Sequence, residues 1–326
     1  MHTQNARVAR FTLALVMALA ASTPLLAAEP WPQRPVRLIV PVGAGSGTDI
    51  AARLFAEKMA ERWKQPAFIE NRPGADGLIG TAAFAGMRDD HTLLYWNSSA
   101  FTLYPLLQQK LSYDPQRDIV PISIATENSF VIAASNRSRL HSLDELFVAA
   151  RSQPGQLNYN AGAGELPYLF AGFLKTAGIE MTQVPYRDFI LSAQDLAEGS
   201  LDIYAAVLTT VLPLAEAGKI KLLAVTSRQR APIAPNVPTA IEQGFPDGEF
   251  DGLTGFFGPS GMPADRRHRV AADVRAVAAD PVLTDRLRAL GQTVHTSTPA
   301  EFTAAIDERY AKMAAIVTLI GNKPAR

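Results

Sequence analysis

The sequence of 326 residues contains no cysteine. Disulfide bonds, thiolate metal sites and a cysteine nucleophile are therefore excluded. A lipid-modified N-terminal cysteine is excluded as well, so we expect a soluble mature protein without an acyl anchor.

The sequence also lacks a net charge, since 31 basic residues stand against 31 acidic ones. Loss of Arg7 and Arg10 with a cleaved leader would leave 29 basic residues, a net charge of about −2. Neither balance favours nucleic acid or an anionic membrane surface, so we expect no nucleic-acid partner.

Long apolar runs are missing after the N-terminus. The N-terminus itself has a basic start at Arg7 and Arg10, a short apolar run over 11–20, and small residues before Glu29. This order is typical of a secretory signal peptide, predicted over residues 1–28, rather than of a buried N-terminal helix. Leu26 is bulkier than the cleavage pattern prefers. We expect a periplasmic protein in a Gram-negative host.

Catalytic and metal-binding patterns are absent too. The histidines show no metal-ligand spacing, and no Ser–His–carboxylate motif can be written. We therefore expect no metal, no cofactor and no enzymatic activity. Several large aromatic residues and one methionine are better interpreted as core residues than as a cofactor site: Met87, Tyr95, Trp96, Phe256 and Phe257.

Short β-rich runs alternate with amphipathic helices, which indicates an α/β protein. About 300 mature residues suffice for two domains. Helices are expected from about Asp49 to Trp63, after Ser142 and Thr298 with capping boxes, and from Pro263 towards Ala279. Strands are expected at 36–40, 68–70, 92–96, 130–134, 157–159, 201–205 and 221–226.

Glycine-rich turns between strand and helix are the main candidate sites. Such turns let a ligand approach the backbone, and the N–H groups at a helix start attract anions. The first turn, Pro41 to Asp49, matches neither the G-x-G-x-x-G motif nor a P-loop. The second turn, Asn160 to Glu165, precedes a helix with Pro167 near its start. We predict that the two turns face one cleft. The candidate ligand-binding residues are Gly43, Ala44, Gly45, Ser46, Gly47, Thr48 and Asp49, then Asn97 and Ser98, Gly164 and Glu165, and Tyr186 and Arg187.

The sequence resembles the tripartite tricarboxylate transporter substrate-binding proteins, the TctC or Bug family, over nearly its whole mature length. The matching segments are Trp31 to Pro41, Thr48 to Arg53, Glu70 to Gly80, Tyr113 to Pro115, Pro154 to Tyr159, Val184 to Arg187, Asp195-Leu196, Ala217 to Lys219, Leu223 to Ser227, Val237 to Thr239, and Gly258-Pro259 with Pro263.

The resemblance implies a type II periplasmic-binding-protein fold, in which two α/β domains joined by a hinge close on a ligand cleft. We place the discontinuous first domain at 29–126 plus 250–326 and the second at 127–249. The implied partners are a small organic acid and membrane transporter subunits, with the protein itself a monomer. As an alternative, the same two-domain binding protein presents its ligand to a membrane signalling partner. A third reading, an exported hydrolase using Ser46, lacks the G-x-S-x-G spacing.

The candidate pocket departs from the family pattern. Glu165 stands where a hydroxyl residue is common, and Arg187-Asp188 replaces the usual Lys-Gly. Two alternatives for Glu165 follow. Its side chain either caps the following helix, or it faces the cleft and selects a ligand with a cationic, amide or hydroxyl group.

Overall fold

The computed structural model describes residues 31–107, 111–186 and 189–321. The chain falls into two compact units, residues 1–33 and 34–326, and every helix and strand described below belongs to the second unit. The predicted signal peptide lies outside the described residues.

The first sheet has the order β11-β4-β10-β3-β1-β2. Strands β1 (Val36–Val40), β2 (Ala67–Asn71) and β3 (Thr92–Asn97) run parallel, with β1 between the other two. Strand β10 (Gly252–Pro259) lies antiparallel between β3 and β4 (Ile119–Asn128), and β11 (Gln292–Val294) forms the edge. The carboxyl ends of β1 and β3 therefore meet at one edge, which is where ligands bind in such sheets.

The second sheet has the order β7-β6-β8-β5-β9. Its strands are β5 (Phe130–Ser135), β6 (Asn158–Ala161), β7 (Thr182–Gln183), β8 (Ile203–Val207) and β9 (Ile220–Val225). Strand β5 is antiparallel to both neighbours, whereas β6 is parallel to β7 and β8.

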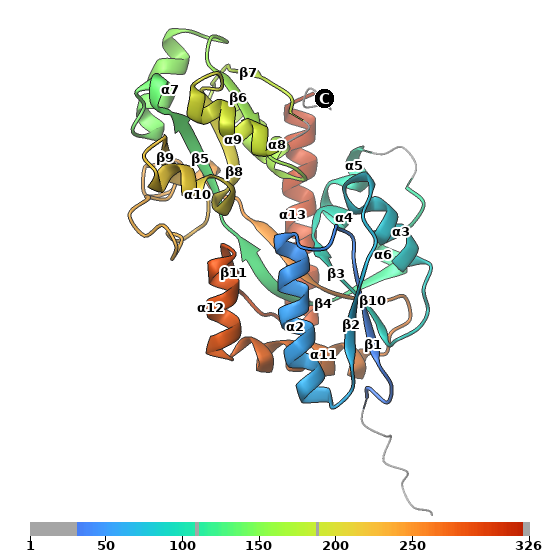
Figure 1. The fold of residues 1–326 in the computed structure, drawn as a ribbon. Helices are drawn as coiled ribbons and strands as arrows, with labels where there is room; N and C mark the ends of the chain where they lie inside the picture. The colour runs from blue at the N-terminus through green and yellow to red at the C-terminus, as the bar shows by residue number, and fades with distance from the viewer. Residues whose placement is uncertain (1–30, 108–110, 187–188, 322–326) are drawn as a thin grey trace, which may run out of the picture. The chain divides into compact units, whose positions relative to one another are not determined.

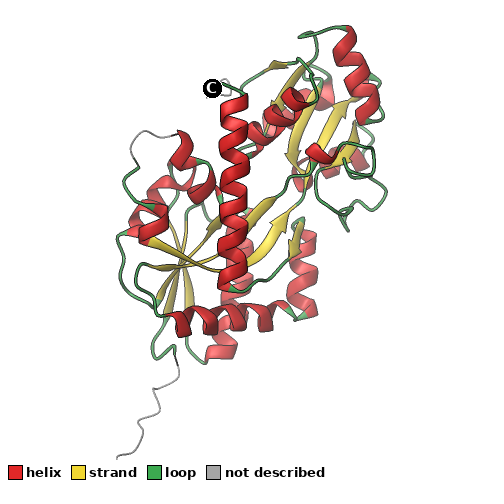
Figure 2. Ribbon diagram, turned by 180° about the vertical axis from the view of Figure 1, so that it is seen from behind, coloured by secondary structure: helices red, strands yellow, loops and turns green. Residues whose placement is uncertain are grey.

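Helices cover the faces of both sheets (Figures 1 and 2). Helix α13 contacts β4 of the first sheet and also α8, which itself contacts β6 and β8 of the second sheet. No helix in the described part combines the length and apolar character needed to cross a membrane. The helices are α2 (Gly47–Trp63), α3 (Leu78–Ala85), α4 (Ser99–Thr102), α5 (Tyr104–Leu107), α6 (Pro115–Asp118), α7 (Leu143–Ser152), α8 (Leu166–Thr176), α9 (Phe189–Glu198), α10 (Leu208–Glu216), α11 (Ala264–Ala278), α12 (Pro281–Ala289) and α13 (Pro299–Leu319), with short 3-10 turns at Ala75–Gly77, Asn136–Ser138 and Pro246–Gly248.

The expected strands and helices are present, with ends shifted by one or two residues. The capping box at Thr298 is confirmed, because Thr298 and Glu301 exchange both hydrogen bonds. At Ser142 only half of the box forms: Ser142 accepts from the N–H of Glu145, while the Glu145 carboxylate accepts from the N–H of His141. The chain passes from the first sheet to the second after Asn128 and returns before Gly252. The domain boundaries themselves remain a prediction.

Aromatic side chains fill the core of the first sheet, as expected. Tyr95, Phe256 and Phe257 are fully buried, and the rings of Tyr95 and Phe256 lie 5.0 Å apart. Met87 is partly buried against the same core. Trp96 is only 5% exposed, but unlike the others it also borders a cavity.

Candidate functional site

The turn between β1 and α2 is organised by a buried carboxylate. Asp49 is 1% exposed and accepts hydrogen bonds from the N–H of Gly45, from Arg53 and from Asn71, at 2.8, 2.9 and 2.8 Å. Burial acts to raise the pKa of Asp49, but these hydrogen bonds outweigh it and hold the pKa below 3.8. Ser46 caps the helix by accepting from the N–H of Asp49. The turn is thus fixed from within, while the first N–H groups of α2 lack helical partners.

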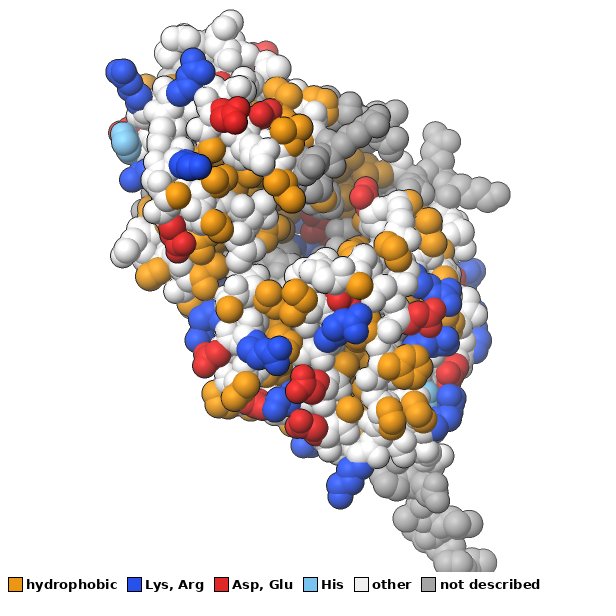
Figure 3. Space-filling model, viewed as in Figure 1, with side chains coloured by type: hydrophobic (Ala, Val, Ile, Leu, Met, Phe, Trp, Pro, Cys, Tyr) orange, Lys and Arg blue, Asp and Glu red, His pale blue; other side chains and the backbone are white. Residues whose placement is uncertain are grey.

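A cavity of about 440 Å³ lies at this turn, a volume suited to a small molecule. We call it the interloop cavity. Figure 3 shows a recess on this face near the N-terminal end of α2. The cavity is lined by Pro41, Val42, Gly43 and Thr48, by Pro73, Gly74, Asp76 and Gly77, by Trp96 to Ser99 with Tyr104, by Asn128 and Phe130, by Ala163 to Glu165 with Val207, and by Gly252 and Leu253.

Both predicted glycine turns reach this cavity. Gly43 and Thr48 come from the β1–α2 turn, and Gly164 comes from the β6–α8 turn. Asn97 and Ser98 line it from the end of β3. The turns that follow strands of two different sheets therefore border one space, while ligand binding by these residues remains a prediction.

Other predicted site residues lie elsewhere. Ala44, Gly45, Ser46, Gly47 and Asp49 build the first turn but do not line the cavity. Tyr186 packs beside the core under α9 and α10, where its hydroxyl donates to Asp195 at 2.6 Å. Arg187 lies outside the described residues.

The loop from Gly74 to Gly77 is a cavity wall that the glycine-turn pattern did not identify. Its four residues all have positive φ, with values of 128°, 47°, 51° and 90°, and such strained backbone is often found at functional sites. A Cβ on Gly77 would lie 2.3 Å from the Trp96 ring, so the indole packs directly on glycine. The hydroxyl of Tyr104 holds the loop by donating to the carbonyl of Asp76. The signal that could have found it is the run of Gly, Asp and Gly after a strand.

The structure contradicts one of the two alternatives for Glu165, and the other stays a prediction. Its side chain accepts no hydrogen bond from the start of α8, so the capping interpretation is wrong. The residue lines the cavity, yet its carboxylate is already bound. One oxygen accepts from the hydroxyls of Ser98 and Thr102, and the other pairs with Arg309 at 3.3 Å.

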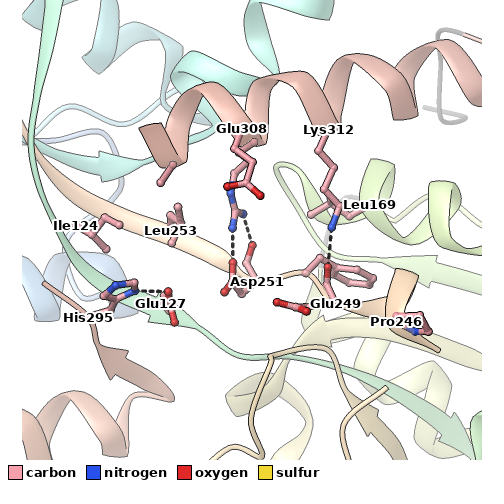
Figure 4. Close-up of a pocket in the computed structure, with 13 residues that line it drawn as sticks. Ile124, Glu127, Leu169, Pro246, Glu249, Asp251, Leu253, His295, Glu308 and Lys312 are labelled. Carbon is pink, nitrogen blue, oxygen red and sulfur yellow. Dashed lines mark hydrogen bonds and ion pairs between the residues drawn. The ribbon is translucent and has the colours of Figure 1, made fainter. Parts of the chain in front are cut away.

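A second cavity, of about 360 Å³, lies beside α13 (Figure 4). Arg309 binds the carboxylate and carbonyl of Asp251 there, and Lys312 donates to the carbonyl of Glu249 at 2.8 Å. His295 pairs with Glu127, and this hydrogen bond raises the pKa of His295. Burial lowers the pKa of Lys312. The charged groups of this cavity thus mostly serve internal contacts.

One group of side chains has the geometry of a metal site. Asp89, Asp90 and His91 each place a ligand atom within 4.8 Å of the others. The two carboxylates already form ion pairs with Arg34 and Arg266, which supply the positive charge that an ion would bring.

The family model of the tripartite tricarboxylate transporter family receptor matches residues 51–322. A Bordetella bronchiseptica UPF0065 protein is 30% identical over 87% of this chain and 85% of its own length. Among solved structures, Rpa4515 of R. palustris with adipate has 28% identity and a TM-score of 0.77, covering 90% of this chain and 99% of that one. MatC from Rhodopseudomonas palustris with bound malate has 27% identity and a TM-score of 0.72, covering 88% and 100%. The fold is that of the periplasmic binding proteins, and this chain belongs to the tripartite tricarboxylate transporter family of receptors.

Proposed function

We propose that this protein is an exported receptor that binds a small organic carboxylate in the interloop cavity and delivers it to the membrane subunits of a tripartite transporter. The observation that carries the proposal is the meeting of two strand–glycine–helix turns at one cavity. The adipate and malate in two structural neighbours support a carboxylate as the ligand.

The carboxylate is held by backbone N–H groups. Helices α2 and α8 have 17 and 11 residues, and each begins at a turn that borders the cavity. Helix N-termini bind anions because their first N–H groups are unpaired and the helix dipole is positive there. No Lys, Arg or His occurs among the described residues of the lining, so the donors there are neutral: these N–H groups and the side chains of Thr48, Asn97 and Asn128.

The receptor role also fits Ser46 better than hydrolysis does. Its hydroxyl caps α2 by accepting from Asp49, and it does not border the cavity. We therefore propose that the protein is not an enzyme. Delivery to a signalling partner instead of a permease remains the alternative. Uptake of radiolabelled solute by vesicles carrying the membrane subunits would separate transport from signalling.

Export is tested by intact-mass analysis of the periplasmic fraction. We expect a monomer that begins near Glu29, and a full-length mass would contradict cleavage of the leader.

Ligand binding is tested by a thermal-shift screen of the purified mature protein against small carboxylic acids. A ligand at about 100 times its dissociation constant should stabilise the protein by about 2.7 kcal/mol. Thr48→Val should weaken binding, because Thr48 borders the cavity, whereas Thr293→Val on exposed β11 serves as the matched control. If no carboxylic acid raises the melting temperature, the proposed function fails.

A further inference from the structure

The charged side chains that face the interloop cavity are all acidic. Asp76 and Glu165 are the two, and the described lining offers no cation against them. A ligand carboxylate must therefore be held by neutral donors while two acidic residues line the same space. The charge at the far end of the ligand then decides how well it binds.

Glu165 is only partly compensated. Arg309 is shared between Glu165, which is 6% exposed, and Asp251, which is 24% exposed. One guanidinium thus serves the two carboxylates of this largely buried trio, and Lys312 also acts on the charge of Asp251. The field of Glu165 reaches the cavity because this residue is part of the wall.

Asp76 contributes a second negative charge, and its carboxylate is free to accept a hydrogen bond from a ligand. Its carboxylate has no hydrogen bond or ion pair in the described part of the chain, and the residue is exposed at the cavity. The positive φ of 51° and the hydrogen bond from Tyr104 to its carbonyl fix its backbone.

Tyr104 lies near both acidic residues, because its hydroxyl donates to the carbonyl of Asp76 and Glu165 accepts from Thr102, two residues before it. Burial is the main cause that raises the pKa of its hydroxyl, and the charges of both Asp76 and Glu165 raise it further. Asp76 and Glu165 therefore both lie near Tyr104 in the cavity wall, and we call this part of the wall the acidic side.

Resting on the proposed function, we propose that this cavity selects amino-carboxylic acids over dicarboxylic acids of the same length. The ligand carboxylate binds the N–H groups of the β1–α2 turn, and the ammonium group faces Asp76 on the acidic side. Asp76 and Glu165 are the specificity-determining residues. At the effective dielectric of a partly buried site, one pair of charges a few ångströms apart changes an affinity by roughly ten- to a hundredfold.

The test is calorimetry of the mature protein with three ligands of equal length. In the six-carbon series these are hexanoate, adipate and 6-aminohexanoate, and the same trio is repeated with four and five carbons. We expect the amino acid to bind at least tenfold more tightly than the dicarboxylate in the series of best-fitting length. Equal or tighter binding of the dicarboxylate at every length overturns the selectivity and leaves the carboxylate receptor standing. If none of the acids binds, and the broader carboxylate screen is also negative, the proposed function fails as well.

Variants assign the effect to its residues. Asp76→Asn removes the charge but keeps a residue type that tolerates positive φ, so the fold should persist. We expect it to reduce the preference for the amino acid by tenfold or more, and Glu165→Gln should act in the same direction. Asp144→Asn, at an exposed position in the first turn of α7, is the matched control and should leave the ratio of affinities unchanged. An unchanged ratio in Asp76→Asn overturns the assignment.

Discussion

Replacing Arg309 by methionine should destabilise the protein by about 3 to 5 kcal/mol, because the change removes the cation from a buried ion-pair network. The Arg309 side chain is 16% exposed and lies between the carboxylates of Glu165 and Asp251. Those charges raise its pKa even though burial acts to lower it. Without the guanidinium two like charges remain at low exposure, and among the described residues only the hydroxyls of Ser98 and Thr102 still bind Glu165.

Urea unfolding of the mature protein measures the effect, with Arg288→Met as the matched control. Arg288 pairs with Asp285, but their side chains are 48% and 68% exposed, so its loss should change the free energy of unfolding by about 0.5 kcal/mol or less. Adding Glu165→Gln to Arg309→Met should restore part of the stability, because it removes one of the unpaired charges. A loss below about 1 kcal/mol in Arg309→Met, or no recovery in the double variant, would refute this reasoning.

Three further changes test other parts of the structure. The hydrogen bond that His295 donates to Glu127 raises the pKa of His295 above 6.5, so its contribution to stability is present below that pH and lost as the pH rises through the folded value. The difference in unfolding free energy between wild type and His295→Gln should therefore be larger at about pH 6 than at about pH 8.5. The hydrogen bonds that lower the pKa of Asp49 stabilise the fold above pH 3.8. Asp49→Asn should therefore lower the free energy of unfolding by about 1 to 3 kcal/mol at neutral pH, and this loss should shrink as the pH falls below 3.8. Gly77→Ala should cost about 1 to 3 kcal/mol and weaken ligand binding, because its Cβ meets Trp96 at 2.3 Å. Gly86→Ala, with φ of −77° and its nearest atom at 3.7 Å, should be neutral or stabilising in the same melting experiment.

The sequence was sufficient to predict most strands and helices, because the periodicity of apolar residues and helix capping depend on a few neighbouring residues. Thr298 shows this, since its capping-box partner Glu301 lies three residues away and the box forms as expected. Ser142 shows the limit: its Glu145 is at the right spacing but binds the N–H one residue earlier.

The candidate site was predictable in part. The glycine turns at Gly43 and Gly164 are local signals, and both reach the cavity. The partner of Glu165 was not predictable, because Arg309 lies 144 residues further along the chain and only tertiary packing brings it close. Asp76 was missed for a different reason: it lies in the short 3-10 turn Ala75–Gly77, outside the strand–glycine–helix pattern, although Asp tolerates positive φ.

The position of β10 has a consequence for the order in which the chain can assemble. Strand β10 begins at Gly252, yet it lies between β3 and β4, which are complete by Asn128. The second sheet uses only strands between Phe130 and Val225, so its chain emerges in full while the first sheet still lacks a central strand. During synthesis β3 and β4 therefore wait with unpaired backbone edges, which readily pair with other chains. We expect nascent chains that end between Asn128 and Gly252 to need a holding chaperone.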